Sequence, residues 1–146
     1  MKSTKLLGLA LSLASMMYLT ACDDNDNNGN NGGNLAPAGF GGRTAQVTVN
    51  DGSAPFSNTG TYTLVTDRAG NATSGNYTIT GDGATIGDSS GTWTYNRNST
   101  NTAAIVLEDS SQGTVTSDLT FDTATSGSLS SQNVDGAFQN GTFSTQ

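Results

Sequence analysis

Histidine is absent from this 146-residue chain, lysine occurs only at Lys2 and Lys5, and Cys22 is the single cysteine. Nucleophilic mechanisms that pair serine or cysteine with histidine, or serine with lysine, therefore have no base beyond the first few residues. Zinc, haem and copper sites lack their usual nitrogen and sulfur ligands for the same reason. These classes of enzyme and metal protein are excluded, and we expect neither a cofactor nor a metal.

Positive charge is also scarce. Beyond residue 21 only Arg43, Arg68 and Arg97 stand against all twelve acidic residues, so the formal charge of that part is −9. A surface of this kind repels phosphate backbones and anionic lipid headgroups. We therefore expect no nucleic-acid partner and no docking on a membrane through charge.

The first 22 residues have the pattern of an export signal. Lys2 and Lys5 give a positively charged start, and residues 6–17 are mostly apolar. This apolar run is shorter than the roughly 20 residues that span a bilayer. Leu19-Thr20-Ala21-Cys22 follows, and it resembles the lipobox of bacterial lipoprotein signal peptides.

The resemblance implies that the Cys22 thiol receives a diacylglycerol, and that a signal peptidase cuts between Ala21 and Cys22. Acyl chains contribute about 0.8 kcal/mol per buried methylene group, and two or three of them anchor a protein stably. An ordinary secretory signal cut near Ala21, or an uncleaved amino-terminal helix, would also fit the apolar run. We expect a lipid-anchored, extracytoplasmic protein of the bacterial cell envelope.

The membrane that holds the anchor is left open. Asp23 and Asp24 follow the cysteine directly, and they resemble the signal that retains some lipoproteins in the inner membrane. The rule differs between bacterial lineages, so both the inner and the outer membrane fit.

A polar linker follows the cysteine. Residues 23–34 contain no apolar side chain, so they cannot bury surface to offset the entropy of ordering. We expect a flexible tether over 22–42, with Phe40 as the first side chain to dock on the domain. Asp24, Asp26 and Asn28 match half of a calcium-loop pattern, but its closing glutamate position falls on Leu35. We favour a plain linker.

The rest of the chain, 43–146, is rich in threonine, glycine, serine and asparagine. Threonine favours pleated strands, and the other three favour turns. Short alternating apolar runs recur at intervals of roughly 10 to 15 residues, which is typical of β-meanders and barrels. We predict one all-β domain, an antiparallel up-and-down meander that closes as a barrel of about eight strands, with a sandwich as the alternative. The expected strands span 44–50, 61–67, 76–80, 91–96, 102–108, 113–121, 126–131 and 137–143.

Three stretches carry a family resemblance: Gly91-Thr92-Trp93-Thr94-Tyr95, Asn101-Thr102-Ala103, and residues 119–127 with Leu119, Phe121 and Ser126-Gly127. They are similar to the recurring sequence pattern of calycin-like β-meander domains of bacterial lipoproteins. The resemblance implies a barrel with an interior, and it assigns no catalytic residue.

Aromatic side chains give the candidate ligand-lining residues. Trp93 and Tyr95 share a strand face by alternation, and Tyr62 and Tyr77 occupy equivalent positions on two other strands. An aromatic-lined interior of this kind binds small apolar ligands or sugars. The alternative is that the same four side chains fill the core.

Carboxylates give the only enzymatic alternative. Two of them at the right separation could cleave a glycoside, and Glu108 and Asp118, which fall on or at the end of predicted strands, are the candidates to inspect. Asp82 and Asp88 lie in a predicted turn, where they could cap the backbone or hold calcium. We expect a non-enzymatic binding or structural module, with a carboxylate-dependent glycoside hydrolase or envelope-processing enzyme as the alternative.

Overall fold

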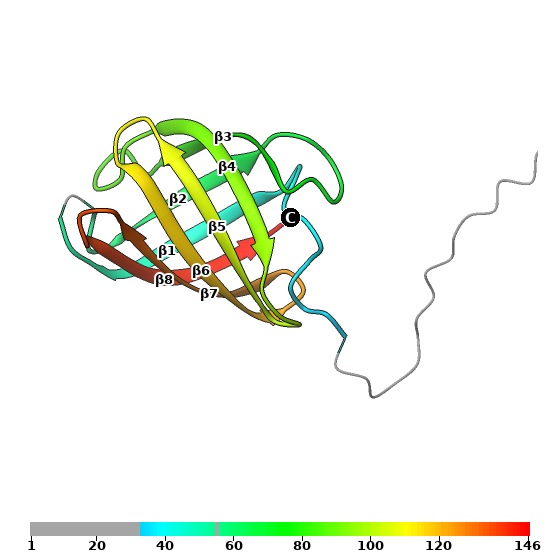
Figure 1. Cartoon of the computed structure of the whole chain (residues 1–146). Helices are drawn as coiled ribbons and strands as arrows, with labels where there is room; N and C mark the ends of the chain where they lie inside the picture. Colours follow the sequence, from blue (N-terminus) through cyan, green and yellow to red (C-terminus); the bar gives the residue numbers. More distant parts are fainter. Residues whose placement is uncertain (1–32, 55) are drawn as a thin grey trace, which may run out of the picture. The chain divides into compact units, whose positions relative to one another are not determined.

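The computed structural model describes residues 33–54 and 56–146, so the expected signal peptide, Cys22 and the calcium-like pattern lie outside the described residues. Each of eight strands pairs antiparallel with the next, and the last pairs with the first, which closes a barrel (Figure 1). The predicted eight-stranded up-and-down barrel is thus confirmed. The strands are β1 (Thr44–Gly52), β2 (Gly60–Thr66), β3 (Ser74–Gly81), β4 (Ser89–Arg97), β5 (Thr102–Asp109), β6 (Gly113–Thr123), β7 (Ser126–Asn133) and β8 (Phe138–Thr145).

Alternation along the strands decides which side chains enter the barrel. On β4, Trp93 and Tyr95 are buried while the threonines beside them are exposed. β5 contains the continuous apolar run 103–107, a pattern that by itself predicts a strand buried on both faces or crossing the centre, and the structure shows that this prediction is wrong. Its alternate residues face the core, whereas Ala104 and Val106 are half-buried on the outside. Val106 is paired with Thr94 and Thr116 of the neighbouring strands.

Glycines let neighbouring backbones approach where the small barrel bends. A Cβ atom on Gly91 would overlap the carbonyl oxygen of Glu108, and one on Gly127 would overlap that of Thr120. Any larger residue must therefore push two paired strands apart. Glycine at such positions is a recurrent device for tight curvature in barrels.

The segment before β1 closes one end of the barrel. Phe40 is 2% exposed, and its ring stacks on Tyr95 with the centroids 5.6 Å apart. The Tyr95 hydroxyl donates to the Pro37 carbonyl over 2.8 Å, and the Ala36 amide donates to the Thr100 carbonyl over 2.9 Å. Among the described residues, Leu35 and Ala36 already contact the barrel, inside the range 22–42 that the sequence assigned to the tether.

Candidate functional site

The end of the barrel opposite the Phe40 segment contains a cavity of about 340 Å³. The β1–β2, β3–β4 and β5–β6 connections surround it, together with inward-facing side chains of the strands. Its apolar wall consists of Phe56, Tyr62, Ile79, Ile86, Leu107 and Val115. This end of the barrel is therefore open to a molecule of modest size.

A second cavity, of about 20 Å³, lies deeper in the barrel. Tyr62, Leu107 and Ser117 line both cavities, and Phe40 belongs to the lining of the deeper one. The remainder of the deeper lining is apolar. The interior thus becomes narrower and more apolar from the open end toward the Phe40 segment.

The polar groups that line the open cavity differ in whether they have hydrogen-bond partners. The hydroxyls of Ser117 and Ser131 are buried and bond to each other over 2.7 Å. The side-chain oxygen Oε1 of Gln112 is also buried, but it accepts no hydrogen bond from any described residue. A buried acceptor without a partner is costly, and Gln112 Oε1 has almost no accessible surface through which a ligand could reach it.

Asp109, at the end of β5, is the most extensively bonded side chain of the cavity. Its Oδ2 accepts from the hydroxyls of Tyr77 and Ser89, at 2.6 and 2.7 Å. Its Oδ1 accepts from the amide and the hydroxyl of Ser111 and from the amide of Gln112. Burial raises the pKa of the Asp109 carboxyl, but these hydrogen bonds outweigh burial and lower the pKa to about 2. Asp109 is therefore ionised at neutral pH, and its hydrogen bonds connect β3, β4 and the β5–β6 turn at this end.

The four aromatic candidates occupy different levels of the barrel, and only Tyr62 lines the open cavity. Tyr77 contacts its wall through Asp109, and burial, with that hydrogen bond, raises the pKa of its hydroxyl. Burial also raises the pKa of Tyr62.

Trp93 and Tyr95 lie away from the open cavity. Trp93 is 1% exposed, and its indole nitrogen donates to the Asn76 carbonyl over 3.1 Å. Tyr95 packs on Phe40, and burial raises the pKa of its hydroxyl to about 12 against the opposing effect of two arginines. The structure therefore brings Tyr62 and Tyr77 to the site and places Trp93 and Tyr95 in the core and at the closed end.

The carboxylates predicted as enzymatic candidates face outward. Glu108 is exposed and accepts a hydrogen bond from the Thr114 hydroxyl, and Asp118 is exposed in the middle of β6. Asp82 accepts from the backbone of its own turn and from the Thr85 hydroxyl, and that hydroxyl is the main cause of its low pKa. Within 33–54 and 56–146, no cluster of three acidic, cysteine or histidine residues could hold a metal ion.

Sequence reasoning missed Gln112 and the serine pair. Ser117 interrupts the inward series of Val115 and Leu119, and Ser131 follows Leu129 in the same way. A polar residue at a position that alternation assigns to the core was the available signal for a lined cavity. Gln112 lies in a turn, and nothing in its local pattern marks it.

Comparison with known proteins adds little beyond the fold. No protein family and no curated protein sequence matches the chain. One solved structure, described as a redesigned β-barrel, aligns with a TM-score of 0.49 and 21% identity, over 77% of this chain and 92% of that one. In the described part of the chain, no helix is long and apolar enough to cross a membrane.

Proposed function

We propose that this protein is a lipid-anchored, extracytoplasmic lipoprotein whose barrel binds a small, mainly apolar molecule without transforming it. The observation that carries the binding role is the cavity of about 340 Å³ at the open end. Most small-molecule sites are concave, largely apolar and furnished with a few polar groups, and this cavity has that make-up. The calycin-like sequence rhythm and the barrel fold are consistent with the same role.

The closed end supports the same proposal. Phe40 and the segment around it seal the barrel at one end, so a bound molecule can enter and leave at the other. A barrel whose only purpose was structural would gain stability from a filled interior, because buried apolar surface and close packing stabilise a fold. A barrel that keeps an open cavity lacks the stabilisation that a filled interior would give.

The glycoside hydrolase alternative would have to use Asp88 and Asp109, the two carboxylates that line the cavity. Such an enzyme needs a carboxylic acid that is protonated near neutral pH to protonate the leaving group. The low pKa of Asp109 opposes that role, and its five hydrogen bonds occupy the oxygens that a nucleophile would use. These observations favour binding over catalysis.

Binding is tested with the fluorescent amine N-phenyl-1-naphthylamine, which is uncharged and brightens in apolar surroundings. The protein is the chain from residue 22 with Cys22→Ser. Ser117→Phe fills the cavity from an inward position, so we expect it to weaken probe binding at least tenfold. Thr116→Phe is the matched control, because Thr116 is exposed on the outer face of the same strand. Loss of binding in both variants, or in neither, with Trp93 emission unchanged, would contradict the proposed site.

The anchor is tested separately. Replacing Cys22 with alanine removes the thiol that would receive the lipid, and the processing that depends on lipidation should then stop. We expect uncleaved precursor to accumulate, which mass spectrometry of whole cells detects. A mature chain of normal mass in the Cys22→Ala strain would rule out lipidation.

A further inference from the structure

Three polar side chains form a continuous row across the inside of the barrel. Ser117 of β6 is paired with Ser131 of β7, and Ser131 is paired with Gln139 of β8. All three line the open cavity, and they are 6%, 3% and 7% exposed in that order. Residues directly opposite each other on neighbouring strands have Cβ atoms about 4.5–5.5 Å apart, so one polar group of a ligand can reach adjacent members of this polar row.

Gln139 is the member of the polar row that has no partner. Its side chain is buried in the barrel, and its carboxamide makes no hydrogen bond with a described residue. Gln112 Oε1 is the one described side-chain atom that is both fully enclosed and unpartnered. The carboxamide of Gln139 therefore keeps accessible surface, and this surface opens into the cavity that Gln139 lines. A ligand that pairs with it removes the cost of a buried polar group without a partner.

The serine pair leaves one donor unused. Two hydroxyl groups have two hydrogens, and the bond between Ser117 and Ser131 uses one of them. The carboxamide of Gln139 adds two donors on Nε2 and an acceptor, Oε1. The polar row therefore offers both donors and an acceptor. A carboxylate, which only accepts, would leave Oε1 unpaired, and an ammonium, which only donates, would leave Nε2 and the spare hydroxyl hydrogen unpaired.

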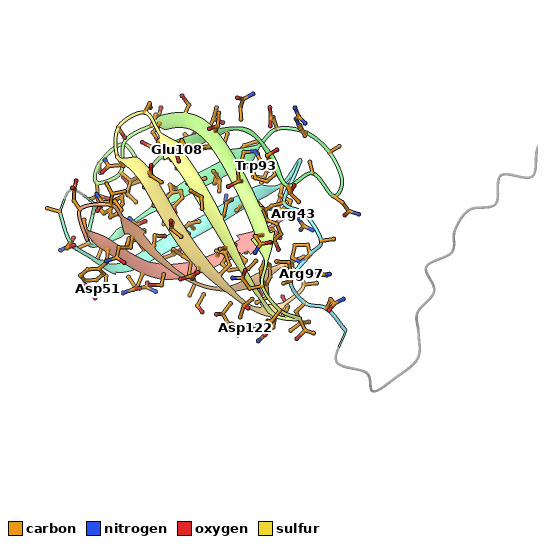
Figure 2. The ribbon with its side chains drawn as sticks, in the orientation of Figure 1. Arg43, Asp51, Trp93, Arg97, Glu108 and Asp122 are labelled. Atoms are coloured by element: carbon orange, nitrogen blue, oxygen red, sulfur yellow. The ribbon has the colours of Figure 1, made fainter. Side chains whose placement is uncertain are left out.

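No cation lies near the polar row to compensate an anionic ligand. Arg43 precedes β1, Arg97 ends β4, and the third arginine of the described residues lies in the β2–β3 connection, all at the closed end. Figure 2 shows Arg43 and Arg97 at one end of the barrel, with Asp51 and Glu108 toward the other. The cavity lining contains the carboxylate of Asp109 and no arginine. An anionic head group would be buried without a counter-ion, which is costly.

The wall across from the polar row is apolar. The strand order of the closed barrel puts β2 and β3 on the side opposite β6 and β7. Tyr62 of β2 and Ile79 of β3 line the cavity there. A ligand that bonds to the polar row with its head group therefore places the rest of its surface against Tyr62 and Ile79, and that part must be apolar.

We infer that the open cavity takes an uncharged ligand with an apolar body and a head group that joins an N–H to a carbonyl, as in a primary carboxamide or a lactam. In these groups the N–H and the carbonyl point to the same side, so both can pair with one glutamine. The N–H donates to Gln139 Oε1, and the carbonyl accepts from Gln139 Nε2 and from the spare serine hydroxyl. The inference rests on the proposed binding function and names its ligand class.

The test compares four compounds that share one apolar body: 2-(2-naphthyl)acetamide, 2-naphthylacetate, 2-(2-naphthyl)ethylamine and 2-ethylnaphthalene. Calorimetric titrations use the full chain in lipid nanodiscs, with empty nanodiscs as the blank. We expect the acetamide to bind about tenfold more tightly than either charged compound, because a buried charge without a partner is costly. It should bind about fivefold more tightly than 2-ethylnaphthalene, which makes no hydrogen bonds.

Two variants locate the preference. Gln139→Met removes the carboxamide at similar side-chain length, so the advantage of the acetamide over 2-ethylnaphthalene should fall by about fivefold while 2-ethylnaphthalene binds as before. Ser131→Ala removes one hydroxyl of the pair and should reduce the same advantage by about threefold. Gln132→Met and Ser130→Ala are the matched controls, because both residues are exposed on the outer face of β7.

A measurement without ligand separates binding from a structural role of Gln139. Its carboxamide has no described partner, so Gln139→Met should not lower the free energy of unfolding, which urea unfolding followed by Trp93 emission measures. A clear loss of stability in this variant would mean that the carboxamide holds the barrel together, and it would overturn the inference.

The titrations also separate the inference from the function beneath it. If the acetate or 2-ethylnaphthalene binds as tightly as the acetamide, the barrel binds small molecules but the ligand class is wrong. The inference fails as well if Gln139→Met and Gln132→Met leave the preference for the acetamide equally large. If none of the four compounds binds, the proposed binding function fails together with it.

Discussion

At the scale of single residues, Asp109 connects the fold to the site. One carboxylate accepts hydrogen bonds from β3, from the start of β4 and from the β5–β6 turn. These elements form part of the cavity wall, so the same bonds that fix the turn also fix the position of Gln112. The site depends on Asp109 even though the carboxylate itself has little capacity left for a ligand.

The pKa of Asp109 predicts how stability depends on pH. Its folded-state value of about 2 lies below the ordinary 3.8, so the carboxylate stabilises the fold above about pH 4 and loses this contribution as the pH falls toward 2. Asp109→Asn should lower the free energy of unfolding by about 1 kcal/mol at pH 7, an amount reduced for partial exposure to solvent. The difference from the unmodified protein should shrink toward pH 2.

Urea unfolding followed by the emission of Trp93, at several pH values between 7 and 2, measures this effect. Asp122→Asn is the control, because Asp122 is exposed at the end of β6. A difference of the same size at pH 2 and pH 7 would mean that the charge of Asp109 is not the cause.

At the scale of elements, the alternation of side chains was enough to predict all eight strands. Threonine and serine alternate with bulky apolar residues so regularly that β4 and β6 could be placed from the sequence within two residues at each end. A continuous apolar run did not predict burial on both faces of β5, because small side chains such as Ala104 are tolerated on an outer face beside threonines. Packing of the Phe40 segment was only partly predictable, since no alternation marks a segment that is not a strand.

The cavity was harder to predict than the strands because strand periodicity assigns a side chain to the interior without giving its height along the barrel. Tyr62 and Tyr95 both point inward, yet one lines the open cavity and the other packs on Phe40. The position of a side chain along the barrel axis depends on the register between strands, and only the structure gives that register. The four aromatic candidates are interior residues, of which only Tyr62 lines the open cavity, and their role toward a ligand stays a prediction.

The glycines that permit curvature give a prediction at this scale. Gly91→Ala adds a Cβ atom that would overlap the Glu108 carbonyl on the paired strand, so we expect a loss of about 1–3 kcal/mol, as for other overpacked positions. Gly87→Ala is the control, because no atom lies within 4 Å of the added Cβ atom. Thermal unfolding of the two variants measures the difference. Equal midpoints would contradict the close approach of β4 and β5.

At the scale of the whole molecule, the two ends of the barrel differ in packing and in charge. One end is sealed by Phe40 and holds the arginines, and the other contains the cavity and most of the acidic residues. The described part of the chain begins at the sealed end, where Ala36 bonds to Thr100.

The central claim is that the barrel carries a small molecule, and a native mass spectrum of the protein purified gently from its producing cells tests it most directly. The account predicts a reproducible additional mass that disappears on denaturation and belongs to a small, mainly apolar compound. A bare polypeptide mass in every preparation, obtained under conditions that preserve the fold, would contradict the account and favour a barrel that works through its outer surface.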